Sequence, residues 1–265
     1  MQRRPLGIRA RYHVRVRLLV ISDIHGNLAA LEAVLGDAQA RTYRETAFLG
    51  DALGYGPKPR EVLALLRELD PICVLGNHDA WALELARGGD PVGDGVVGQA
   101  LRWQLGQLAP GDLKWVGAWP DGFDDEQIGG RYRHGSPSAL NTYVDSLQDA
   151  REAFAQWGDR LCFVGHTHLP SAYASLIAPT GAWIKHHALS DGGPYQVPPP
   201  ARVILNPGSV GQPRDGDPRA SYAIFDSRTG VFEVFRVAYD VARTQAEIRA
   251  AGLPEVLASR LEIGN

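Results

Sequence analysis

Five short polar stretches, four of which directly follow apolar runs of strand type, constrain this chain more than any other feature. They are Asp23–Asn27, Gly50–Asp51, Gly76–Asp79, His134 and Gly165–His168. They hold five of the eight histidines in the chain, and each contains a side chain that binds hard metal ions. Because these ligands are carboxylates, imidazoles and an amide, without thiolate, they suit manganese, iron or magnesium better than a structural zinc ion. A pair of such ions is suited to the hydrolysis of phosphate esters.

The first half of the chain alternates short apolar runs with helical periodicity. The apolar runs at 16–21, 47–49 and 72–75 predict strands, and the segments 28–38 and 61–69 predict helices. This alternation is typical of a largely parallel sheet that is covered by helices.

The second half is richer in predicted strands, several of which show the period-two alternation of a sheet with two different faces. A helix is predicted over 150–157, and the glycines and prolines of 190–200 predict a surface loop. The predicted strands span 128–134, 161–164, 172–177, 183–187, 202–205, 222–225 and 231–237. Since no linker divides the chain, we expect two packed mixed sheets with helices outside them, in one domain over residues 17–265 that ends in a helical tail.

The ligand-type residues are expected to converge, because ligands gather beyond the carboxyl ends of strands in open α/β sheets. Spacing supports this. In extended backbone, residues two apart point the same way, so His25 is expected to share the direction of Asp23. The same spacing relates His168 to His166. Four ligand-type residues each follow a different predicted strand within a few positions: Asp23, Asp51, Asn77 and His166.

The motifs DxH, GD, GNHD, a lone histidine and GHTH occur here in the order in which the calcineurin-like metallophosphoesterases carry them. The chain resembles that family, and within it the small bacterial and archaeal phosphodiesterases. The resemblance covers Arg17 to Tyr239 and includes the runs Asn206–Ser209 and Arg219–Phe225. It implies a four-layer α/β/β/α sandwich of two mixed β-sheets flanked by helices, with a dinuclear metal site between loops at one edge of the sheets.

The resemblance also assigns roles to individual residues. The first metal ion would be held by Asp23, His25 and His168. The second would be held by Asn77, His134 and His166, and Asp51 would bridge both ions. The neighbouring His78 would face the scissile phosphate, where it would stabilise charge or protonate the leaving oxygen. Asp51, Asn77 and His78 would thus form the catalytic group.

The expected reaction is hydrolysis of a phosphodiester or phosphomonoester bond in a small substrate, with nucleotides among the candidates. A hydroxide that bridges two divalent ions would attack phosphorus in line with the leaving oxygen. Manganese is the favoured metal, and iron, nickel, cobalt, magnesium and zinc remain open. The candidate contacts to substrate phosphate are Asn206, Ser209 and Arg214. Asp79 would either orient His78 or cap the helix that begins there.

Two alternatives share the same fold. Ser/Thr protein phosphatases and dinucleoside polyphosphate hydrolases usually carry GDxVDRG, whose arginine grips phosphate. The stretch Gly50–Gly56 has no arginine in that place, so the sequence favours this alternative less. Arg214 would be able to replace the missing arginine as the contact to phosphate. A non-catalytic scaffold, like the retromer subunit of this fold, lacks the catalytic histidine, whereas His78 is present here.

Composition and charge argue against several other classes of protein. The formal net charge of −3 gives no electrostatic case for nucleic acid, and the apolar run that ends at Ile21 is too short to span a membrane. Both cysteines, Cys73 and Cys162, lie in apolar runs and are interpreted as packing residues, which is consistent with a cytoplasmic location. The arginine-rich residues 1–16 are interpreted as a weakly ordered extension.

Overall fold

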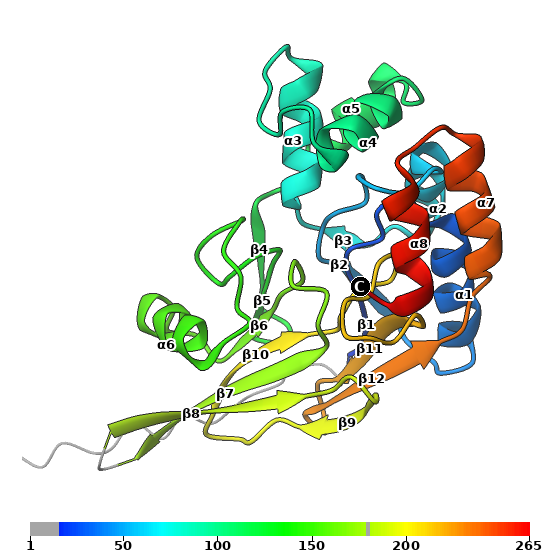
Figure 1. The fold of residues 1–265 in the computed structure, drawn as a ribbon. Coiled ribbons are helices and arrows are strands. Elements are labelled where there is room, and N and C mark those ends of the chain that lie inside the picture. The colour runs from blue at the N-terminus through cyan, green and yellow to red at the C-terminus, as the bar shows by residue number, and fades with distance from the viewer. Residues whose placement is uncertain (1–15, 179–180) are drawn as a thin grey trace, which may run out of the picture.

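The computed structural model describes residues 16–178 and 181–265, and in them two six-stranded sheets pack face to face (Figure 1). In spatial order, the first sheet contains β3 (Ile72–Cys73), β2 (Glu45–Phe48), β1 (Arg17–Ile21), β11 (Ala220–Asp226), β12 (Val231–Val237) and β9 (Gly193–Gln196). The second contains β4 (Gly122–Asp125), β5 (Gly130–Arg133), β6 (Leu161–Phe163), β10 (Arg202–Asn206), β7 (Ser171–Ala178) and β8 (Gly181–Ala188). Both sheets are mixed, as predicted.

Helices cover the outer faces of both sheets. Figure 1 shows α1 (Leu28–Gln39), α2 (Pro59–Leu69), α7 (Val241–Ala250) and α8 (Glu255–Ile263) on the side of the first sheet. On the side of the second sheet lies α6 (Leu147–Gln156). Three further helices, α3 (Asn77–Ala86), α4 (Val96–Leu105) and α5 (Pro110–Val116), lie at one end of the molecule.

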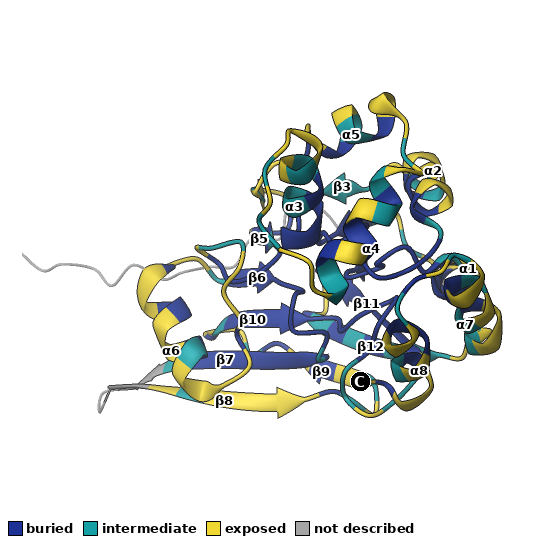
Figure 2. Ribbon diagram, turned by 45° about the horizontal axis from the view of Figure 1, so that its top comes forward, coloured by how far each residue is buried: buried dark blue, intermediate teal, exposed yellow. Residues whose placement is uncertain are grey.

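Strand β1 shows why the layers form. Its side chains alternate between two cores, as the period of two requires. Leu18 and Val20 are buried between the two sheets, whereas Leu19 and Ile21 are buried against the helices of the first sheet. A third core joins β6 and β10 to α6. Three apolar layers therefore separate four structural layers, and the predicted α/β/β/α sandwich is confirmed (Figure 2).

Helix α2 illustrates how local sequence sets an element. Pro59 occupies its first turn, where a missing N–H costs nothing, and Asp70 ends it in a left-handed conformation. Val62, Leu63 and Leu66 form its buried face. Each fully buried aliphatic side chain of this kind contributes about 1.5–3 kcal/mol to folding.

Six parallel strand ends converge at one edge of the sandwich. β1, β2 and β3 run parallel in the first sheet, and β5, β6 and β10 run parallel in the second. The amide of His166, which follows β6, donates to Asp23 Oδ2, which follows β1, at 3.1 Å. The carboxyl ends of both parallel sets therefore meet, as expected from the strand-end positions.

Two strands were not predicted. The segment 190–200 contains β9, which pairs with β12 at the sheet edge, where Pro194 is tolerated. The other is the polar edge strand β4. The prediction for the N-terminal extension concerns residues 1–16, of which residues 1–15 lie outside the described residues and Val16 is buried between the sheets. Among the described residues, no helix has the length and apolarity needed to cross a membrane.

Candidate metal centre

Backbone hydrogen bonds hold the loops after β1 and β2 together. The amide of Asp23 donates to the carbonyl of Gly50 at 3.0 Å, and that of His25 donates to the carbonyl of Asp51 at 2.9 Å. Gly76 approaches Asp51 so closely that a Cβ at position 76 would collide with the carboxylate. Glycine is therefore required there, and the three loops form a rigid cradle.

Most candidate ligands have a strained backbone. Five of the seven adopt positive φ, between 49° and 65°: Asp23, His25, Asp51, His166 and His168. Non-glycine residues rarely adopt this conformation, which concentrates at functional sites. The expectation that Asp23 and His25, and likewise His166 and His168, share a direction through extended backbone is therefore corrected. Left-handed turns, rather than strand geometry, direct these side chains.

The first cluster contains Asp23, His25 and His168, all fully buried. The Nε2 atom of His168 lies 3.3 Å from Asp23 Oδ1 and 3.3 Å from His25 Nε2. The Nδ1–H of His25 donates to the Leu53 carbonyl at 2.7 Å, and that of His168 donates to the Gln212 carbonyl at 2.5 Å. Since a carbonyl only accepts, both rings carry their proton on Nδ1 and present the Nε2 lone pair to the cluster.

The second cluster is built around His134, whose side chain is fully buried. Its Nδ1 donates to the Leu49 carbonyl at 2.8 Å, and its Nε2 lies 2.9 Å from Asn77 Oδ1 and 3.3 Å from Asp51 Oδ2. The same Asp51 oxygen lies 3.6 Å from His25 Nε2. Asp51 therefore lies between the two clusters.

His166 approaches the second cluster from β6. Its ring centroid lies 4.9 Å from that of His134, and the ring of Tyr143 stacks on it at 3.9 Å. Within the described part of the chain, His166 Nε2 and Asp23 Oδ1 are buried atoms without a hydrogen-bond partner. Buried polar atoms are normally satisfied, so these two atoms fit a site that binds a cation.

Burial determines the charge of the first cluster. It lowers the pKa values of His25 and His168 well below the usual range, so both imidazoles are neutral and able to bind metal. Burial, together with the charge of Asp51, raises the pKa of Asp23 to about 6. A carboxylate in this position needs a compensating positive charge, which a divalent ion would provide.

Asp51 and His134 form a buried ion pair. Burial alone would raise the pKa of Asp51, but the charges of His134 and His78 outweigh it and hold the pKa well below 3.8. Burial would likewise lower the pKa of His134, but the charge and hydrogen bond of Asp51 raise it to about 9, so an ion bound by His134 would have to displace this proton. The carboxylate at the centre of the site is therefore ionised.

His78 lies beside this carboxylate, and its amide donates to Asp51 Oδ1 at 2.8 Å. Its ring lies 4.8 Å from that of His25, 4.6 Å from that of Tyr55 and 5.0 Å from that of Trp81. Its Nδ1 has no partner among the described residues, and burial lowers its pKa to about 4. Ring contacts, rather than a carboxylate, hold this imidazole.

Asp79 does not orient His78. Its carboxylate accepts the amides of Asp51 at 2.8 Å, Leu53 at 3.1 Å and Gly76 at 3.1 Å. Of the two roles considered from the sequence, the geometry corresponds to the capping role, because Asp79 caps α3 and braces the loop of Asp51.

Asn206 and Ser209, two candidates for phosphate contact, are buried and face the protein. Asn206 Nδ2 donates to the Gly165 carbonyl at 2.7 Å, and its Oδ1 accepts the Gly208 amide at 2.8 Å. Ser209 Oγ donates to the Asp23 carbonyl at 2.9 Å. Both side chains brace the loops that carry the candidate ligands, and their polar atoms are already engaged.

Several residues around the site were missed from the sequence. Tyr55, Trp81 and Tyr143 surround the histidine rings. Gln104 of α4 accepts the Gly54 amide at 2.7 Å and so fixes the loop before Tyr55. The pattern Gly54-Tyr55-Gly56 is a turn signal that points to Tyr55, whereas no sequence signal marks the other two aromatic residues.

Comparison with known proteins gives one family. Residues 16–230 match the calcineurin-like phosphoesterase superfamily domain. An uncharacterized protein of Methanocaldococcus jannaschii is 34% identical over 254 residues, which cover 95% of this chain and 99% of that protein. The crystal structure of a metallophosphoesterase from Sphaerobacter thermophilus is 40% identical, with a TM-score of 0.81 and coverage of 95% of this chain and 100% of that one.

A shorter similarity concerns a symmetrical bis(5'-nucleosyl)-tetraphosphatase of Coxiella burnetii. It is 37% identical over 71 residues, which cover 26% of this chain and 24% of that protein.

Proposed function

Because this chain belongs to the calcineurin-like phosphoesterase superfamily, we propose that it hydrolyses phosphodiester or phosphomonoester bonds in a small substrate. One observation carries the proposal. Three buried imidazoles, those of His25, His134 and His168, have their Nδ1 atoms bonded to carbonyls, so that each Nε2 faces Asp23 or Asp51. Such an arrangement serves cation binding, and metal dependence is general in this family.

We assign one ion to each cluster. Asp23, His25 and His168 would hold the first ion, while Asn77, His134 and His166 would hold the second. Asp51, between the clusters, would contact both. When bound, two divalent ions would activate water and neutralise charge on the phosphate oxygens. The oxygen and nitrogen ligands favour manganese, and availability would decide among manganese, iron and the related ions.

His78 would act on the substrate. Its ring is adjacent to the cluster, held by Tyr55 and Trp81, and its amide is fixed to Asp51. Because burial lowers its pKa to about 4, this imidazole is neutral at neutral pH and would act through its N–H, either by a hydrogen bond to a phosphate oxygen or by proton donation to the leaving oxygen. The presence of this histidine, together with the full ligand set, argues against a scaffold without activity.

A second candidate is hydrolysis of dinucleoside polyphosphates, which the 71-residue similarity to a bis(5'-nucleosyl)-tetraphosphatase favours. The stretch Gly50–Gly56 lacks the arginine typical of those enzymes. Here Tyr55 is present, and Arg214 Nη2 donates to its hydroxyl at 3.4 Å. Arg214 thus brings a guanidinium to this loop from another part of the chain.

Elemental analysis combined with an activity panel tests the proposal. The panel compares a bis-aryl phosphate, an aryl monophosphate, a cyclic nucleotide, a dinucleoside polyphosphate and a phosphopeptide, each with added manganese. We expect bound divalent metal and turnover of at least one small ester. Preference for the phosphopeptide would favour a protein phosphatase, and absence of turnover with every divalent metal would refute the proposal.

A further inference from the structure

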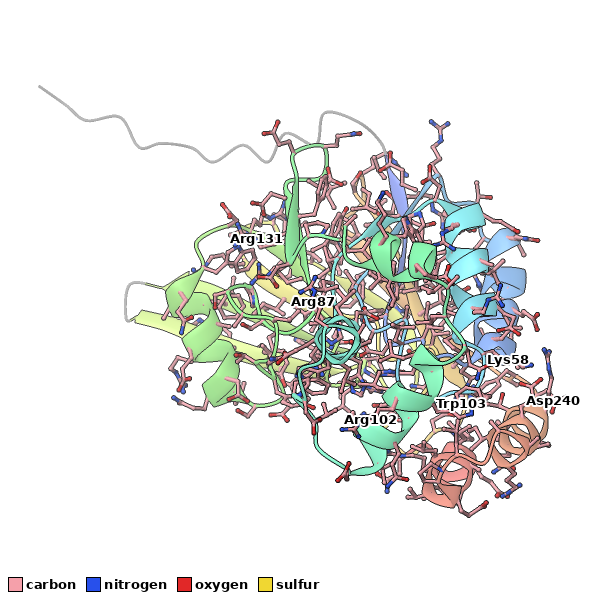
Figure 3. All side chains as sticks on the ribbon, turned by 90° about the horizontal axis from the view of Figure 1, so that it is seen from above. Lys58, Arg87, Arg102, Trp103, Arg131 and Asp240 are labelled. Carbon is pink, nitrogen blue, oxygen red and sulfur yellow. The ribbon has the colours of Figure 1, made fainter. Side chains whose placement is uncertain are left out.

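Tyr55 connects the candidate metal centre to the C-terminal helices. Its backbone is left-handed, with a φ of 56°, and its ring centroid lies 4.6 Å from those of both His25 and His78. The same ring packs in an apolar cluster with Leu257 and Leu261 of α8. Trp103 of α4, labelled in Figure 3, packs against this cluster. Helix α8 is therefore packed against the site, although it lies beyond the residues that match the family domain.

Arg214 reaches the Tyr55 ring from a loop that is firmly held. Its guanidinium lies 6.0 Å from the ring centroid and donates to Gln212 Oε1 at 3.1 Å. Its Nε atom is buried without a hydrogen-bond partner among the described residues. The adjacent Asp215 forms a buried ion pair with Arg236 at 2.5 Å, which anchors the loop. Arg214 is thus positioned with unused hydrogen-bonding capacity.

Arg260 of α8 brings a second guanidinium to the same ring, at 5.9 Å from its centroid. Its Nε donates at 2.5 Å to the main-chain oxygen of Asn265, the last residue of the sequence. The end of α8 is tied to the loop of Arg214, because the amide of Gly216 donates to the carbonyl of Gly264 at 3.0 Å. Burial and the positive charge of Arg214 both lower the pKa of Arg260. Both guanidiniums lie within 6.0 Å of the centroid of one ring, where their like charges oppose each other.

Neither guanidinium has an acidic side chain as a partner in the ranges that the structure covers. The acids nearest to Arg214 in sequence are engaged elsewhere: Asp215 pairs with Arg236, and Asp217 pairs with Arg219 and Arg236. The charge of Arg214 also acts on Asp23, whose pKa it lowers, but the two form no ion pair. Two half-buried cations beside one ring, neither of them paired with an acidic side chain, repel each other. An anion from outside the chain would relieve this repulsion.

We propose that Arg214 and Arg260 bind a second phosphate of the substrate, separate from the phosphate that is hydrolysed. This inference rests on the proposed function, since it places hydrolysis at the adjacent metal centre. Two guanidiniums match the charge of a terminal phosphate, and each offers paired N–H groups to its oxygens. The substrate class is therefore a phosphate ester with another phosphate, either in a diphosphate chain or on a separate carbon.

Three probes that share one nucleoside test this subsite. AMP has one phosphate, ADP has a diphosphate chain, and adenosine 3',5'-bisphosphate has two separate phosphates. Their inhibition constants are measured against hydrolysis of bis-p-nitrophenyl phosphate with manganese. In the wild type, we expect one of the two-phosphate probes to bind about tenfold more tightly than AMP. The better probe identifies the spacing of the two phosphates.

Substitutions of the two arginines then locate the effect. The quantity compared is the ratio of the inhibition constant of AMP to that of the better two-phosphate probe. Arg260→Gln and Arg214→Gln are each expected to reduce this ratio by about tenfold, whereas Arg260→Lys is expected to retain part of it. The matched control is Arg249→Gln, on the exposed surface of α7, where Arg249 pairs with Glu255. This control should keep the wild-type preference. Circular dichroism checks that each variant is folded. If Arg260→Gln does not fold, Arg214→Gln still tests the subsite, because it leaves the sequence of α8 unchanged.

The subsite would be refuted if both glutamine variants kept the wild-type ratio between the inhibition constants of AMP and of the better two-phosphate probe. It would also be refuted if the wild type bound AMP as tightly as it binds both other probes. If the wild type hydrolyses no ester, the proposed function fails and the subsite is still tested. In that case calorimetric titration of the manganese-loaded protein with the same three probes gives the dissociation constants directly.

Discussion

The Nε2 atoms of His25 and His168 lie 3.3 Å apart in the buried interior, and each ring has its proton on the opposite nitrogen. Two lone pairs at this distance repel each other unless a positive charge lies between them. Two nitrogen ligands at about 2.0–2.1 Å from one ion lie about 3 Å apart. The spacing therefore fits a shared cation, and the unliganded protein retains unfavourable electrostatics.

Removal of metal is therefore expected to destabilise the protein. An ion that binds only the folded state adds about 2.7 kcal/mol when its free concentration is 100 times Kd. For a chain of this length, each kcal/mol shifts Tm by about 2–4 °C. Calorimetry with a chelator, and again after manganese is restored, measures the difference. Identical melting temperatures in the two conditions would contradict the metal centre.

Asp51→Asn is expected to abolish binding of both ions. The Asp51 carboxylate contacts His25 of one cluster and His134 of the other, so loss of its charge weakens both sites at once. Elemental analysis after dialysis measures the metal content per chain. The control is Asp94→Asn, since Asp94 is fully exposed. Full occupancy in Asp51→Asn would disprove the bridging assignment.

His78→Ala is expected to lower turnover by about 10²–10⁴-fold, the usual contribution of a positioned acid or base. Metal content should stay unchanged, because the His78 side chain is assigned to the substrate instead of to an ion. Turnover of an aryl phosphate and elemental analysis are measured on the same preparation. His186→Ala, which removes an exposed histidine on β8, serves as the control. A parallel loss of metal would show that His78 is a ligand.

The strand-end positions made the centre of the site predictable. Each apolar run ends at a polar ligand-type residue, so Asp23, Asp51 and His166 could be placed together without knowledge of any loop. The left-handed backbone of these residues could not be predicted, because it depends on contacts between loops far apart in the sequence. Gly76, for example, is required only because Asp51 packs against it.

The surroundings of the site were less predictable for the same reason. Tyr55 and Arg260 meet only when α8 packs against the loop after β2, 205 residues away in the chain. Asp79 looked equally suited to orient His78 or to cap a helix, and only the position of the Asp51 amide distinguishes the two roles. The edge strand β9 was hidden by Gly193 and Pro194, residues that usually mark loops.

Tyr143 is expected to position His166. Its ring stacks on the imidazole at 3.9 Å with an interplanar angle of 16°, while the side chain remains 44% exposed. Tyr143→Ala should weaken binding of the second ion by a few-fold, because an aromatic contact contributes about 0.5–1.5 kcal/mol. Tyr143→Phe, which keeps the ring, should bind manganese like the wild type. Manganese titration followed by calorimetry measures both variants, and equal weakening in both would assign the effect to the hydroxyl.

Asp37 is expected to make stability depend on pH in the acid range. Hydrogen bonds from Arg41 lower its pKa below 3.8, burial opposes this shift, and the buried hydroxyl of Tyr222 adds to it by donating at 2.6 Å. A carboxyl whose pKa is lower in the folded state stabilises the fold above its unfolded pKa. That stabilisation is lost as pH falls through the folded pKa. Asp37→Asn removes the titrating group, and with it about 0.5–1 kcal/mol at neutral pH, because solvent screens this partly exposed ion pair.

Urea unfolding of the metal-free protein measures this effect without a contribution from acid release of metal. The difference between wild type and Asp37→Asn should be constant from neutral pH down to about pH 5, and should shrink toward about pH 3 as the wild-type carboxyl is protonated. Asp94→Asn, at a fully exposed position, should show no such trend. A difference that stays constant across the acid range would mean that Asp37 contributes through shape and hydrogen bonding alone, without its charge.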